Sequence, residues 1–126
     1  MKRSLFWLPA LLLAGLIFWL SSQSKLPEIG PAFWQKDKAA HLIFYGVLGA
    51  FVLLGLRRTT SLSLPKAALL AILITSAYGA SDEFHQRFVP NRTCDVWDWV
   101  ADTTGGALVV SAYFSYESRR NSKTNR

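Results

Sequence analysis

The 126-residue chain has a single cysteine and few charged side chains. One cysteine cannot close a disulfide within the chain, so a disulfide-stabilised scaffold is excluded. Charged residues make up 17% of the sequence, against about 25% in ordinary soluble domains. Disordered chains are poor in apolar residues, whereas this chain is 51% hydrophobic, which excludes intrinsic disorder. The length allows one domain.

The apolar residues fall into four blocks separated by polar segments. No block shows the two-residue alternation of a half-buried strand. A helix needs roughly 20 mostly apolar residues to cross a membrane. The second block qualifies alone, the first and third qualify with Ser, Thr or flanking residues, and the fourth qualifies if Asp98 and Asp102 face protein or water. We therefore predict an all-α protein, a small polytopic membrane bundle of four transmembrane helices in one domain over residues 1–126. The predicted helices lie at about 5–22, 38–57, 64–86 and 95–115.

Two alternatives compete with this prediction. The helices of a soluble four-helix bundle would each carry a polar stripe facing water, whereas residues 5–20 and 42–56 are apolar all round. The first block resembles a signal peptide in that Lys2 and Arg3 precede it and small residues follow. Its 16 apolar residues exceed the usual core of about 7–15, and no Ala-x-Ala motif follows, which favours a retained helix.

Basic residues mark the ends of the apolar blocks and predict an orientation. With a cytoplasmic N-terminus, the cytoplasmic segments hold nine Lys and Arg against one acid, and the opposite segments hold five against seven acids. Short loops rich in Lys and Arg stay in the cytoplasm, so both termini are predicted there. A nucleic-acid-binding protein would instead cluster its bases on one face of a folded domain, so the expected partners are membrane lipids and no nucleic acid.

Titratable side chains gather at the outer ends of the second, third and fourth predicted helices. Such groups are rare in membrane helices without a partner or a function, because removing them from water costs several kcal/mol. Many of them recur at three- or four-residue spacing and therefore share helix faces. The candidate ligand-binding residues are Asp37, His41, Glu83, Gln86, Arg92, Asp95, Asp98 and Asp102.

Two segments in this region resemble the VanZ-like family of small bacterial integral membrane proteins. The first is Asp-Lys-Ala-Ala-His at 37–41, followed by Tyr45. The second is the ordered string Glu-x-x-Gln-x-x-x-Pro-x-Arg-x-x-x-x-x-Asp, which starts at Glu83 and is rare by chance. The resemblance covers about residues 37–106. The chain departs from the family's pattern at Asp102, where many relatives carry Asn.

The resemblance implies a protein of the bacterial inner membrane and cell envelope, since the family is named after an accessory protein of glycopeptide resistance linked to teicoplanin. We predict an outward-facing polar cleft that binds an anionic, lipid-linked headgroup, such as that of a cell-wall precursor. Arg92 would contact phosphate with its fork of donors. The carboxylates would orient it or hold a bridging divalent cation. No other cofactor is implied.

Two other functions remain open from the sequence. In the first, the polar residues only hold the helices together, for instance by pairing Asp37 or Asp98 with Arg92. In the second, the protein is a membrane hydrolase or transferase acting on lipid-linked phosphate, with candidate acid/base residues His41, Glu83 and Asp98. A metal-assisted form of this enzyme would hold Mg²⁺ or Mn²⁺ between Asp37, His41, Asp95 and Asp98.

Overall fold

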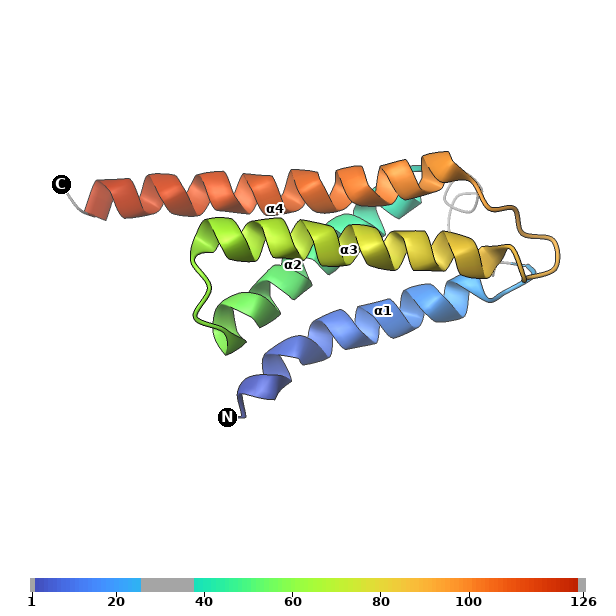
Figure 1. The fold of residues 1–126 in the computed structure, drawn as a ribbon, viewed down its shortest axis with the longest axis horizontal. Coiled ribbons are helices and arrows are strands. Elements are labelled where there is room, and N and C mark those ends of the chain that lie inside the picture. The colour runs from blue at the N-terminus through green and yellow to red at the C-terminus, as the bar shows by residue number, and fades with distance from the viewer. Residues whose placement is uncertain (1, 26–37, 125–126) are drawn as a thin grey trace.

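The computed structural model describes residues 2–25 and 38–124 of the chain. A short 3-10 helix η1 (Arg3–Trp7) leads into α1 (Leu8–Ser21), and α2 (Lys38–Thr59), α3 (Leu64–Gln86) and α4 (Val96–Thr124) follow. The described residues contain no strand, which confirms the predicted all-α class. In Figure 1, α3 and α4 run side by side, α2 passes behind α3, and α1 lies along the opposite edge of the bundle.

Local sequence signals set several helix ends. Pro9 and Pro65 stand in the first turns of α1 and α3, where the missing proline N–H would have had no helical partner. Asn91 follows Pro90 with a φ of 62°, a left-handed conformation that Asn tolerates better than most residues. Asp95 caps α4, because its Oδ1 accepts the N–H of Trp97 at 2.9 Å.

The outer surface of the bundle is apolar. Arg3–Ser21, Lys38–Thr59 and Leu64–Gln86 are long and apolar enough to cross a membrane. Large apolar side chains on α1 and α3 are exposed, including Leu12 at 66% and Leu69 at 60%. A surface so rich in exposed apolar groups suits lipid rather than water, which argues against the soluble bundle and identifies a multi-pass membrane protein.

α4 is longer than predicted. It continues to Thr124, whereas the sequence pattern placed its end near residue 115. No Gly or Pro follows Gly106 to interrupt the helix, and Arg120 pairs with Glu117 at 3.4 Å one turn away. The basic C-terminal segment is therefore helical up to Thr124.

The tightest contact in the bundle is the crossing of α2 and α4. Glycines from both helices face each other there, and a Cβ added at Gly49 would lie 3.2 Å from the Cα of Gly106. A Cβ added at Gly105 would collide with the carbonyl oxygen of Leu42, which belongs to the backbone and cannot rotate away. Small residues at such crossings let membrane helices pack closely through their backbones.

α1 is attached to α2 and α3 by specific contacts. The Trp7 indole N–H donates to the Thr59 hydroxyl at 3.1 Å, and the Trp7 ring fills the space where a Cβ of Gly55 would stand. On the other side, the Tyr78 hydroxyl donates to the carbonyl oxygen of Ala14 at 2.6 Å. The first helix is thus an integral part of the bundle.

The glycine crossing can be tested by adding one methyl group. Gly105→Ala is expected to lower the free energy of unfolding by about 1–3 kcal/mol, because α2 and α4 must separate to admit the methyl. Reversible unfolding in mixed detergent measures the change. Gly15→Ala in α1 is the control, since nothing lies within 4 Å of its added Cβ. Equal stability of the two variants would contradict the close crossing.

Candidate functional site

Polar side chains converge where the start of α2, the end of α3 and the start of α4 meet. These three helix ends lie together because α3 runs back along α2 and α4. We call the group at this end the polar cluster. Its members are Lys38, His41, Tyr45, Asp82, Glu83, Asp95, Asp98 and Asp102.

The centre of the polar cluster is a histidine–aspartate pair. His41 Nδ1 lies 2.8 Å from Asp102 Oδ1, and His41 Nε2 lies 3.7 Å from Asp98 Oδ2. The Asp102 side chain is fully buried, and that of His41 is 24% exposed. Gly79 on α3 makes room for Asp102, because a Cβ at that position would lie 3.0 Å from Asp102 Oδ2.

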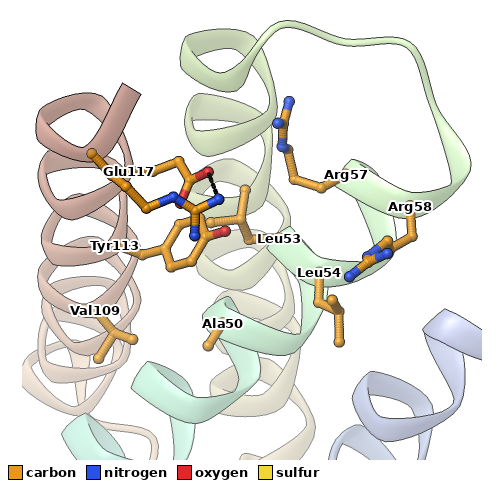
Figure 2. A pocket seen from close by; sticks show the side chains of 9 residues that line it. Ala50, Leu53, Leu54, Arg57, Arg58, Val109, Tyr113 and Glu117 are labelled. Carbon is orange, nitrogen blue, oxygen red and sulfur yellow. Dashed lines mark ion pairs between the residues drawn. The ribbon is translucent and has the colours of Figure 1, made fainter. Parts of the chain in front are cut away.

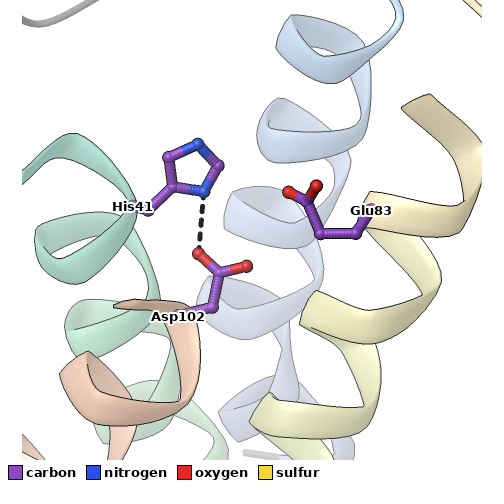
Figure 3. Close-up of side chains that lie close together, drawn as sticks. All are labelled: His41, Glu83 and Asp102. Atoms are coloured by element: carbon purple, nitrogen blue, oxygen red, sulfur yellow. Dashed lines mark hydrogen bonds and ion pairs between the residues drawn. The ribbon is translucent and has the colours of Figure 1, made fainter. Parts of the chain in front are cut away.

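Glu83 completes a three-residue group with this pair. It is 4% exposed, and its Oε2 accepts the backbone N–H of Asp95 at 3.1 Å. Figure 3 shows Glu83 reaching from α3 toward Asp102 and His41. His41 offers a ring nitrogen, and Glu83 and Asp102 each offer a carboxylate oxygen. These three atoms lie within 4.8 Å of one another, which is close enough for them to bind one metal ion.

Two buried oxygens of this group lack hydrogen bonds. Glu83 Oε1 and Asp102 Oδ2 are shielded from solvent and have no hydrogen-bond partner among the described residues. Buried polar atoms are almost always paired in folded proteins, so each exception needs an explanation. A bound cation or a proton would satisfy both oxygens.

Asp82 and Tyr45 form a second buried pair beside the first. The Tyr45 hydroxyl donates to Asp82 Oδ2 at 3.3 Å, and both residues are at most 5% exposed. The sequence analysis did not include this pair in the site. The signal was present, since Tyr45 lies one turn after His41 and Asp82 directly precedes Glu83.

Lys38 bridges two acids at the rim of the polar cluster. Its Nζ lies 3.2 Å from Asp95 Oδ2 and 3.3 Å from Asp98 Oδ1. Asp95 stands outside the helices, where the backbone N–H of Trp97 and the ammonium of Lys38 hold its pKa below the usual value for Asp. Asp95 therefore remains ionised in this loop at neutral pH.

Arg92 contacts α1 rather than the centre of the polar cluster. Its Nε donates to the carbonyl oxygen of Gln23 at 3.0 Å, and its Nη2 donates to that of Leu20 at 2.8 Å. These carbonyls lie at the C-terminal end of α1, where cations are favourable. His85 supports the same junction, with Nε2 3.0 Å from the Ser22 hydroxyl and its ring stacked on Phe18.

The structure brings together five of the eight predicted ligand-binding residues, with Asp95 at the rim of the polar cluster. His41, Glu83, Asp98 and Asp102 lie in the polar cluster, and Gln86 is buried about one turn beyond Glu83. Asp95 serves as the cap of α4 and the partner of Lys38. Asp37 lies outside the described residues. Among the described residues, the group whose ligand atoms lie close enough to hold one metal ion is His41 with Glu83 and Asp102, and of the predicted metal set it includes only His41.

Apolar helices around a buried carboxylate–imidazole cluster define a small multi-pass membrane protein with a polar site at one end of its bundle. The family model described as VanZ/LLP1 matches residues 6–117, and the chain belongs to this family. The match confirms the resemblance found in the sequence and extends it to α1 and most of α4. No curated protein and no solved structure matches the chain.

The role of Arg92 at the end of α1 gives a test. Arg92→Lys keeps the charge but cannot reach both carbonyls with a rigid fork, so the free energy of unfolding is expected to fall by about 1.5–3 kcal/mol. Detergent unfolding measures this change. Arg87→Lys is the matched control, because Arg87 is exposed and its guanidinium lies over the Phe84 ring. Unchanged stability in Arg92→Lys would show that the cap contributes nothing.

Proposed function

We propose that this VanZ-like membrane protein binds an anionic, lipid-linked headgroup through a divalent cation held by His41, Glu83 and Asp102. The observation that carries the proposal is the pair of buried, unpaired oxygens, Glu83 Oε1 and Asp102 Oδ2. An ionised carboxylate buried without a compensating charge or hydrogen bond is costly. A cation between the two carboxylates and the imidazole removes that cost.

The ligand set favours Mn²⁺. Carboxylate oxygens suit Mg²⁺ and Mn²⁺, whereas an imidazole nitrogen favours transition metals. His41 Nδ1 and Asp102 Oδ1 are 2.8 Å apart, close to the roughly 3 Å between neighbouring ligands of one octahedral ion. The hydrogen bond between them would give way to two bonds to the metal when the imidazole is neutral.

A bound cation would also make an acidic site receptive to phosphate. The polar cluster contains five acids against Lys38 and His41, so an anion alone would be repelled. A divalent ion with three protein ligands keeps positions open for phosphate oxygens. Lys38 at the rim is half exposed and adds a positive charge beside the site. Trp97, 63% exposed at the start of α4, would lie at the membrane interface in the proposed topology, where Trp is enriched in membrane proteins.

The class of ligand follows from the depth of the site and from the family. A phosphate attached to a membrane lipid lies at the level of the headgroups, where the ends of the helices are expected. The VanZ-like resemblance, with its link to teicoplanin tolerance, favours a lipid-linked cell-wall precursor. We therefore propose polyprenyl phosphate or its glycosylated forms as the ligand class.

One observation favours an enzyme as the second candidate. Asp102 holds His41 through Nδ1 and leaves Nε2 on the side of Asp98, which is the arrangement of a histidine oriented by a carboxylate for proton transfer. The protein would then be a hydrolase or transferase acting on lipid-linked phosphate. Turnover of phosphorylated lipid by the purified protein distinguishes this candidate from binding alone.

We further propose four spans in the bacterial inner membrane, with both termini in the cytoplasm. Basic residues at the ends of α2 and α4 and the start of α3 support this orientation, because they lie at the end of the bundle opposite the polar cluster. The polar cluster would then face outward, where lipid-linked cell-wall precursors are used.

The metal site is tested with the purified full chain in detergent. Wild-type protein treated with EDTA and then given Mn²⁺ is expected to bind one ion, read by electron paramagnetic resonance. His41→Gln and Glu83→Gln should each weaken binding by about 100-fold, because each removes a ligand. His85→Gln is the matched control, since that histidine lies against α1 and outside the three-residue group.

Phosphate binding is measured separately, with a polyprenyl phosphate in the same detergent. Binding should require Mn²⁺ and should disappear with EDTA and in Glu83→Gln. If Mn²⁺ binds but leaves polyprenyl phosphate binding unchanged, the headgroup proposal is wrong and the metal site stands. If neither ligand binds, the polar cluster is only structural.

The orientation is tested through Cys94, the single cysteine, which is exposed in the segment between α3 and α4. A membrane-impermeant maleimide should label Cys94 from outside spheroplasts, because the proposed orientation places this segment outside. Cys94→Ser with Ser122→Cys moves the thiol into the C-terminal part of α4 and should be labelled only after lysis. The reverse pattern would invert the topology.

A further inference from the structure

A cavity of about 540 Å³ lies between α2 and α4, at the end of the bundle opposite the polar cluster. Figure 1 shows α2 diverging from α4 toward their C-terminal ends. We call this cavity the arginine groove. Its lining residues are Ala50, Leu53, Leu54, Arg57, Arg58, Val109, Tyr113, Glu117 and Arg120.

Both walls of the arginine groove change from apolar to charged in the same direction. On α2, the lining residues run from Ala50 to Arg58 at the three- and four-residue spacing of one helix face. On α4, they run from Val109 to Arg120 at similar spacing. Because the two helices run in the same direction, the groove has an apolar floor and a basic rim (Figure 2).

The rim carries an excess of positive charge. Three arginines face one acid, and Arg120 is paired with Glu117 at 3.4 Å. Arg57 uses one donor on the carbonyl oxygen of Leu62, and the guanidinium of Arg58 lies 5.2 Å from the centre of the Phe6 ring. A guanidinium has five N–H donors, so these contacts position the arginines and leave donors for a further anion.

We propose that the arginine groove binds one anionic glycerophospholipid, with its phosphate at Arg57, Arg58 and Arg120 and an acyl chain along the apolar floor. The volume lies within the range of about 300–1,000 Å³ of small-molecule sites. Charge complementarity selects an anionic headgroup, because basic pockets between membrane helices bind acidic phospholipids. The groove shares no residue with the polar cluster, so this inference does not depend on the proposed metal site.

The experiment is native mass spectrometry of the detergent-solubilised full chain with added lipid. Wild-type protein is expected to retain one phosphatidylglycerol in preference to phosphatidylcholine. Arg57→Gln with Arg58→Gln should weaken phosphatidylglycerol retention by about fivefold per arginine and leave phosphatidylcholine retention unchanged. Glycerol phosphate, which has no acyl chain, should not displace the bound lipid.

Arg119→Gln is the matched control, because Arg119 is exposed next to Arg120 but does not line the groove. It should retain phosphatidylglycerol like the wild type. Loss of retention in Arg119→Gln equal to that in the double variant would show general charge attraction and overturn the proposal. Equal retention of the two lipids by wild-type protein would overturn it as well, whatever the stability of the variants.

Discussion

The close crossing of α2 and α4 organises the rest of the molecule. Gly105 lies against the Leu42 carbonyl, so the two backbones touch without an intervening side chain. Leu42 is next to His41, and Asp102 lies one turn before Gly105, so the same contact holds His41 Nδ1 2.8 Å from Asp102 Oδ1. Beyond the crossing the two helices separate (Figure 1), and the residues of the arginine groove line the space between them. One packing contact thus sets the geometry at both ends of the pair.

The low dielectric around the helices makes any unpaired buried oxygen in the polar cluster costly. Asp98 pairs with Lys38, whereas Asp82 accepts a hydrogen bond from Tyr45 through Oδ2 and keeps its buried Oδ1 without a partner among the described residues. Glu83 and Asp102 likewise each keep one buried oxygen without a partner among the described residues, and these two acids belong with His41 to the group that could hold one metal ion. If the polar cluster only held the helices together, every buried oxygen would be expected to have a partner. Hydrogen bonds between membrane helices are worth only about 0.6 kcal/mol on average, which does not offset unpaired buried oxygens.

The α2–α4 pair presents opposite charge at its two ends. Acids and a histidine surround its N-terminal end, and arginines surround its C-terminal end. Under the two proposals, anionic lipid would be bound differently at each end, through a cation where the protein is acidic and directly where it is basic. Arg92 belongs to neither end, because its donors hold the last carbonyls of α1. Basic residues in this chain therefore lie in at least two structural settings, the C-terminal end of α1 and the rim of the arginine groove.

The sequence by itself determined the helical class, the bounds of α3, the start of α2, and the region where the titratable residues meet. Hydropathy and helical spacing depend on residues close together in the chain, so they can be read without tertiary contacts. Only the tertiary structure decided that Glu83 joins His41 and Asp102, that Arg92 caps α1, and that a groove opens between α2 and α4. Periodicity defines the face of a single helix, but the rotation and crossing point of two helices depend on contacts such as that of Gly105 with Leu42, which lie far apart in the chain.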